Sequence, residues 1–199
     1  YFMDSYYNTD SFDMGEANNE NLIVKSTLDY KRYQLTADGI SPRAIPGFGQ
    51  GLVCVDSDEH DEAGHITEDL KIRVDMVNKR LVKRKQMVDE SIHPELIGPV
   101  DYKNLVVCWG STYNCIKEVS KILGRADTAF LHYSQVFPVH SSTASILKKA
   151  SRVIIIEGNA TCQFGKILKL ETGIEFDEKI LKYNGITFSV EEVTTKLNE

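Results

Sequence analysis

Residues 152–157 have the sequence RVIIIE, and the run Val153-Ile154-Ile155-Ile156 within them decides the fold class. β-Branched side chains of this kind favour a strand. Apolar and polar residues do not alternate along the run, so both faces of the strand should be covered, as inside a parallel sheet. Parallel strands need long crossover connections, which helices usually supply. The stretch therefore predicts an α/β domain.

The segments on either side of this strand fit that domain. Further strands are expected at residues 105–109, 128–133 and 186–189, and helices at residues 111–123, 142–150, 160–172 and 190–197. We predict an open, mostly parallel sheet with helices on both faces and right-handed crossovers, occupying residues 104–199.

The residues before this domain follow another pattern. Residues 1–30 are expected to be a linker from a missing upstream domain, because their first part is polar and aromatic without periodicity. The segment GISPRAIPGFGQG (39–51) is too rich in Gly and Pro for a long helix, and a brief strand is expected at 52–55. A long helix should begin with Thr67 as N-cap and end before Pro94. Residues 31–103 are thus predicted to form an irregular arm and a long helix.

Charge and composition exclude some classes of function. The net charge is −6, and basic residues are interspersed with acidic ones, which argues against a nucleic-acid-binding track. No apolar run is long enough to cross a bilayer, and no signal-type leader is evident, so we expect no membrane partner and a cytoplasmic location.

The four cysteines, Cys54, Cys108, Cys115 and Cys162, give no C-x-x-C pair of the kind that zinc and iron–sulfur sites use. We interpret all four as reduced, structural residues. Cys162 and Ser111 lie near the N-termini of predicted helices, a position that lowers a thiol pKa or favours an anion.

Loops at the carboxyl ends of the strands are where ligands meet such a sheet. The candidate crevice residues are Gly110, Ser111, Thr112, Gly158, Asn159 and Gln163. The single glycine of WGST falls short of a dinucleotide or P-loop motif, and the simpler interpretation is that these residues turn the chain and cap helices.

The arm contains a second candidate region. Glu59-His60-Asp61-Glu62 and His65 are dense in potential ligands for a divalent ion, but their spacing fits neither H-E-x-x-H nor an EF-hand. A solvated or partner-facing acidic loop is the alternative that we prefer, with no metal, cofactor or catalytic residue assigned to the chain. Apolar residues displayed beside charge predict an interface with Arg43, Phe48, His60 and His65 as its candidates. The other interpretation is that Ile45 and Phe48 seal the edge of their own domain.

Five segments, in order, resemble the last third of the α subunits of 2-oxoacid:ferredoxin oxidoreductases, with the 2-oxoglutarate branch closest. They are DGISPRAIPG (38–47), DSDEHDEAGHITED (56–69), VVCWGSTY (106–113), LHYSQVFPV (131–139) and VIIIEGNATCQFGKILKLETG (153–173). The similarity runs from about residue 30 to the end.

This resemblance implies a domain like the C-terminal domain of transketolase, downstream of the domain that binds the pyrimidine ring of thiamine pyrophosphate. It also implies a β subunit that holds the pyrophosphate, Mg²⁺ and an iron–sulfur cluster, with ferredoxin and coenzyme A as partners of the complete enzyme. The complete enzyme would decarboxylate a 2-oxoacid oxidatively to an acyl-CoA. This chain would serve subunit assembly and the shaping of the site, and is expected to be inactive alone.

The sequence is also compatible with two alternatives from other functional classes. One is an independent flavodoxin-like nucleotide-binding module with its ligand against Gly110, Ser111 and Gly158. The other is a purely structural assembly domain.

Overall fold

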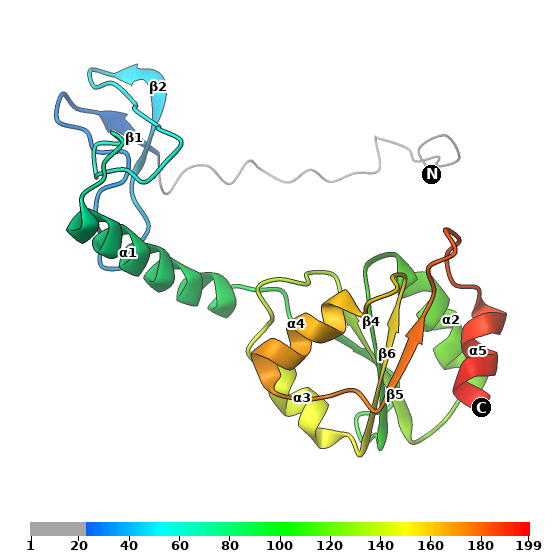
Figure 1. Ribbon diagram of the computed structural model, residues 1–199. Helices are drawn as coiled ribbons and strands as arrows, with labels where there is room; N and C mark the ends of the chain where they lie inside the picture. Colours follow the sequence, from blue (N-terminus) through cyan, green and yellow to red (C-terminus); the bar gives the residue numbers. More distant parts are fainter. Residues whose placement is uncertain (1–22) are drawn as a thin grey trace. The chain divides into compact units, whose positions relative to one another are not determined.

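The computed structural model describes residues 23–199, and the chain divides between Arg84 and Lys85 into two compact units (Figure 1). We call the described residues up to Arg84 the arm unit and residues 85–199 the sheet unit. Residues 1–22, most of the predicted linker, lie outside the described residues. The predicted boundaries at residues 30 and 103 stay predictions. Among the described residues, no helix is long and apolar enough to cross a membrane.

The sheet unit is built on five strands in the order β3-β5-β4-β6-β7. The strands are β3 (Glu95–Ile97), β4 (Asn104–Trp109), β5 (Thr128–Tyr133), β6 (Arg152–Glu157) and β7 (Glu178–Leu181). β4, β5, β6 and β7 are parallel, and β3 runs antiparallel at the edge beside β5. β6 lies between two parallel neighbours and is buried from Val153 to Glu157, as its apolar run predicted.

Each face of the sheet has its own hydrophobic core, because successive strand residues point to opposite faces. On one face Val107, Leu131 and Ile155 pack with α3 (Thr143–Lys149) and α4 (Gln163–Thr172) through Leu147 and Leu168. On the other face, Val106, Phe130 and Ile154 pack with α2 (Tyr113–Leu123) and α5 (Val190–Asn198). Figure 1 shows these helix pairs on the two sides of the sheet. The predicted fold class is confirmed.

Three of the predicted elements differ in the structure. The predicted strand at residues 186–189 is wrong: Ile186 is 69% exposed, and the last strand is β7. Ser189 instead caps α5, because its Oγ accepts from the Glu192 N–H while the Glu192 carboxylate accepts from the Ser189 N–H. The helix expected from residue 111 begins as a 3-10 turn, η2 (Gly110–Thr112), and the helix expected from residue 160 begins at Gln163.

The arm unit contains β1 (Ile23–Ser26) and β2 (Arg43–Gly49), which pair in parallel, and most of helix α1 (Leu70–Asp89). The predicted loop at 39–51 thus includes a strand, whereas the strand predicted at 52–55 is absent from the structure of that segment. Helix α1 begins three residues after the predicted N-cap, Thr67. Asp69 caps it, since its Oδ1 accepts from the N–H groups of Lys71 and Ile72.

Candidate functional site

The carboxyl edge of the sheet carries a cleft of about 470 Å³ within the sheet unit. β4 and β6 end there at Trp109 and Glu157, and the predicted crevice residues Ser111, Thr112 and Gly158 line it. The opposite wall comes from residues 182–188, among them Lys182, Tyr183 and Phe188. Sequence reasoning missed this wall because it placed a strand at residues 186–189.

Lys182 is the charged residue of the cleft lining, and its charge is already paired. Its Nζ lies 2.6 and 2.7 Å from the two Glu192 carboxylate oxygens and donates to the Thr187 carbonyl at 2.9 Å. On the other wall, Thr112 Oγ1 donates to the Trp109 carbonyl at 2.8 Å. The cleft is therefore better suited to a neutral polar group than to a phosphate.

The remaining crevice candidates hold the chain in place and are not among the residues lining the cleft. The Gly110 carbonyl accepts a hydrogen bond from His132 Nε2 at 2.9 Å, which makes Nε2 the protonated nitrogen. Asn159 Oδ1 accepts from the N–H groups of Thr161 and Gln163 at 3.1 and 3.2 Å. The capping interpretation therefore holds for Asn159.

Glu157 is the one carboxylate among the described residues that is completely buried. Its oxygens accept from the backbone N–H groups of Phe164 at 3.1 Å and Gly165 at 2.7 Å, and from Asn159 Nδ2 at 2.5 Å. The two backbone donors belong to the first turn of α4, whose N–H groups have no partner within the helix. Glu157 thus joins the end of β6 to the start of α4, which gives it a structural role.

Cys162 lies beside this carboxylate, and its pKa is raised to about 11. Burial is the main cause, and the hydrogen bond with Glu157 and the negative charge of that residue add to it. The expectation that a helix N-terminus would lower this thiol pKa is wrong, because burial and the Glu157 carboxylate outweigh the helix dipole. Burial likewise raises the pKa of Cys108 to about 12. Neither thiol is suited to nucleophilic catalysis.

These environments predict an order of reactivity for the cysteines. Iodoacetamide reacts only with the thiolate form of cysteine, so the reagent must reach a thiol that can lose its proton. At about pH 8 we expect Cys54 to be labelled first, because its side chain is only half-buried. Cys115 should be slower, because burial raises its pKa. Cys108 and Cys162 should stay unlabelled until the protein unfolds. Peptide mass spectrometry over time measures the order, and labelling of Cys162 as fast as Cys54 would contradict the assigned environments.

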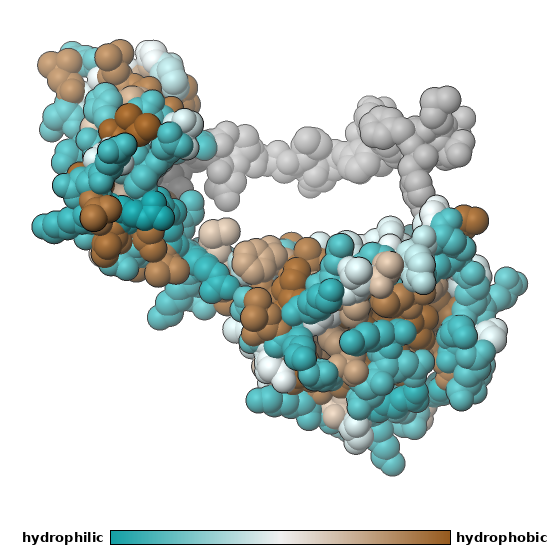
Figure 2. Space-filling view, in the orientation of Figure 1, coloured by the Kyte–Doolittle hydropathy of each residue, from teal (hydrophilic) through white to brown (hydrophobic). Residues whose placement is uncertain are grey.

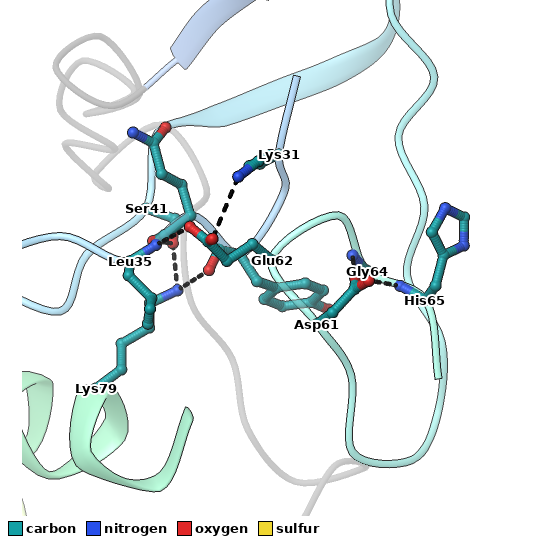
Figure 3. Close-up of polar contacts among 10 residues, drawn as sticks. Lys31, Leu35, Ser41, Asp61, Glu62, Gly64, His65 and Lys79 are labelled. Atoms are coloured by element: carbon teal, nitrogen blue, oxygen red, sulfur yellow. Dashed lines mark hydrogen bonds and ion pairs between the residues drawn. The ribbon is translucent and has the colours of Figure 1, made fainter. Parts of the chain in front are cut away.

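In the arm unit, carboxylates of the acidic segment bind other parts of the same unit (Figure 3). The Glu62 carboxylate accepts from the Leu35 N–H at 2.9 Å and from Lys31 Nζ at 3.2 Å. The Leu35 hydrogen bond is the main cause that holds the Glu62 pKa below its usual value. Glu59 makes a two-bond ion pair with Arg80 of α1, at 2.8 and 3.1 Å. These carboxylates are partnered rather than simply solvated.

The two histidines of this segment have different surroundings. His60 is half-buried and stacks on Tyr33 with ring centroids 3.7 Å apart, and its buried Nδ1 has no hydrogen-bond partner. His65 is exposed, and in Figure 3 its ring points away from Asp61 and Glu62. The structure therefore does not bring these five residues together as one metal site.

Comparison with known proteins identifies relatives over most of the chain, although no profile of a known protein family matches it. The chain is 30% identical over 181 residues to the α subunit of 2-oxoacid:ferredoxin oxidoreductase 1 from Sulfurisphaera tokodaii. It is 33% identical over 179 residues to an α subunit from Saccharolobus solfataricus, and 34% identical over 172 residues to one from Aeropyrum pernix. These alignments take in 88%, 86% and 82% of this chain.

The chain is homologous to the α subunits of 2-oxoacid:ferredoxin oxidoreductases. It spans 28% of the length of the Sulfurisphaera and Saccharolobus α subunits and 26% of the Aeropyrum one. Among solved structures, the 2-oxoglutarate:ferredoxin oxidoreductase of Magnetococcus marinus, with 2-oxoglutarate, coenzyme A and succinyl-CoA bound, gives a TM-score of 0.78. That match covers 85% of this chain and 30% of the other at 24% identity, and supports the transketolase C-terminal-like fold.

Two of the predicted interface residues, Arg43 and Phe48, lie on the surface of the arm unit. Arg43 is exposed on β2, and Phe48, at the end of the same strand, is 50% exposed. Ile45 is exposed as well, whereas Ala44 between them is buried. The interface assignment and the alternative in which Ile45 and Phe48 seal the edge of their own domain both stay predictions.

Proposed function

We propose that this chain is the C-terminal, transketolase-like part of the α subunit of a thiamine-dependent 2-oxoacid:ferredoxin oxidoreductase, with 2-oxoglutarate as substrate. The complete enzyme would convert the 2-oxoacid and coenzyme A to an acyl-CoA with reduction of ferredoxin. The part of this chain would be to assemble the subunits and shape the catalytic site, and the chain alone would be inactive. The homology to α subunits carries the proposal.

Among the described residues, the cysteines of the sheet core and the lining of the cleft do not offer the donor sets that the cofactors of such an enzyme use. An iron–sulfur cluster needs several thiolates around one point, whereas Cys108 and Cys162 lie in the cores on opposite faces of the sheet. The residues that line the cleft include no carboxylate for Mg²⁺. Thiamine pyrophosphate, Mg²⁺ and the cluster would therefore be held by other parts of the complete enzyme.

The arm unit has the surface expected of an assembly element. Along helix α1 the apolar residues Leu70, Val74, Val77 and Leu81 recur at steps of three or four, which places them on one face. All four are exposed, Leu70 to 78%. Figure 2 shows hydrophobic patches on this unit. Leu52, Val55 and Ile66 are further exposed apolar residues of the arm unit. Several exposed apolar side chains on one small unit indicate a contact with another protein surface.

The assembly role predicts that Arg43→Ala and Phe48→Ser weaken the complete enzyme without unfolding this chain. We expect each to reduce binding of the partner subunit by about tenfold, the cost of one well-placed interface side chain. The stability of the 199-residue chain should change by less than about 0.5 kcal/mol, as for other surface positions. Co-purification, 2-oxoglutarate-dependent ferredoxin reduction and thermal unfolding measure these effects.

A matched control is Leu170→Ser, which removes an 84% exposed apolar side chain on α4 of the sheet unit. It should leave assembly and turnover unchanged. If Arg43→Ala lowered the melting temperature of the chain while assembly survived, Arg43 would be a structural residue and the interface assignment would be wrong.

A further inference from the structure

A cluster of three different ligand types lies in the arm unit. The ligand atoms of Cys54, Asp56 and His65 all lie within 4.8 Å of one another. We propose that these three residues bind a transition-metal dication, with Zn²⁺ as the ion that fits best. The sequence pattern placed His65 in a different candidate set and left out Cys54, because Cys54 and His65 are eleven positions apart.

The backbone holds the two segments of this site side by side. The Asp56 N–H donates to the Gly64 carbonyl at 3.3 Å, and the Cys54 Sγ lies 3.2 Å from the same oxygen. The Ile66 N–H donates to Asp56 Oδ2 at 2.9 Å, which fixes the orientation of the carboxylate as hydrogen bonds to ligating carboxylates do. These contacts place the Cys54 and Asp56 side chains beside the segment that carries His65.

Gly64 permits this close approach. Its φ is +96°, and a Cβ at this position would lie 2.2 Å from the Cys54 carbonyl oxygen. Asp61 shapes the same turn, since its Oδ1 accepts from the N–H groups of Gly64 and His65 at 3.0 Å each. The result is a distance of 3.5 Å between Cys54 Sγ and His65 Nδ1.

The chemistry of the three donors selects the class of ion. Thiolate and imidazole favour Zn²⁺ over Mg²⁺ and Ca²⁺, which prefer oxygen. Zinc is usually four-coordinate, and the exposure of Asp56 and His65 leaves a fourth position for water. Binding would displace the proton of the Cys54 thiol, because the thiolate is the ligand.

Two carboxylates of the segment between the ligands already have partners of their own. Glu59 is bound to Arg80, and Glu62 is bound to Lys31 and the Leu35 N–H. The site is therefore defined by three residues, each of which can be removed separately. A bound ion would tie residues 54–56 to residues 64–66 and stiffen the loop between them.

Titration of the reduced 199-residue chain with Co²⁺ and then Zn²⁺ tests the site. We expect one ion per chain, a dissociation constant for Zn²⁺ at or below about 1 μM, and a sulfur-to-cobalt charge-transfer band in the absorption spectrum. Removing a residue that only hydrogen-bonds a metal ligand typically costs about 10–100-fold in metal affinity. Removing a ligand should cost more, so Cys54→Ser and His65→Asn should each weaken Zn²⁺ binding by about 100-fold or more. Zn²⁺ should also protect Cys54 from iodoacetamide.

The matched control is Cys115→Ser, which removes a half-buried thiol in α2 of the sheet unit and should leave Zn²⁺ binding unchanged. Far-UV circular dichroism checks that each variant is folded. Absence of the charge-transfer band in the wild-type chain, or Zn²⁺ binding that survives both Cys54→Ser and His65→Asn, would mean an adventitious ion only and would overturn the proposal.

Discussion

Replacing Glu157 with alanine is expected to destabilise the sheet unit by at least about 3 kcal/mol, because three hydrogen-bond donors lose their acceptor. Two of these donors are backbone N–H groups at the start of α4, where Phe164 and Gly165 are buried and water has little access. A buried donor left without a partner costs about 1–3 kcal/mol. The single tryptophan of the chain, Trp109, lies in this unit, so its fluorescence during chemical denaturation reports the loss.

Two further variants separate the buried contacts from the loss of a charge. Glu157→Gln keeps one acceptor oxygen but turns its amide toward a donor, so its effect should fall between wild type and Glu157→Ala. Glu178→Ala removes a carboxylate of the neighbouring strand β7 that forms a half-exposed ion pair with Arg152, and should cost less than about 1 kcal/mol. Equal losses in Glu157→Ala and Glu178→Ala would show that Glu157 does not anchor α4.

The contrast between β6 and β7 shows what the sequence could predict about the sheet. β6 is buried on both faces, as its unbroken apolar run predicts. β7 lies at the edge, where only Ile180 of its four residues is buried, so its sequence carries no such run. A short edge strand of this kind depends on pairing with β6, which periodicity along one segment does not reveal.

The candidate site was predictable where it depends on topology and not where it depends on side-chain partners. Ser111, Thr112 and Gly158 were found because strand ends in a parallel sheet meet at one edge. The role of Glu157 was missed, since a carboxylate at a strand end is usually solvated and only the placement of α4 buries it. In the arm, Glu62 meets Lys31 across 31 positions, and no local pattern selects that pair from the other charges.

Replacing Gly39 with alanine is expected to separate the loop before β2 from helix α1 and to destabilise the arm unit by about 2–4 kcal/mol. Gly39 is buried with φ at +75°, and a Cβ there would lie 2.5 Å from the Lys79 carbonyl oxygen and 2.9 Å from the Lys83 backbone nitrogen. Both atoms belong to the helix backbone, which cannot yield without losing its own hydrogen bonds. Moving the loop instead would break the hydrogen bond from Lys79 Nζ to Ser41 Oγ.

Gly47→Ala is the control that isolates this packing effect. Gly47 has a similar φ of +82°, but nothing lies within 4 Å of its Cβ position, so alanine there carries only the conformational cost of about 1 kcal/mol. Hydrogen exchange of the arm-unit amides should therefore accelerate far more in Gly39→Ala than in Gly47→Ala. Because the two units are separately compact, denaturation of the sheet unit followed by Trp109 should be the same in both variants. Equal exchange rates in the two variants would mean that the loop can shift at no cost, and that its contact with α1 does not hold the arm together.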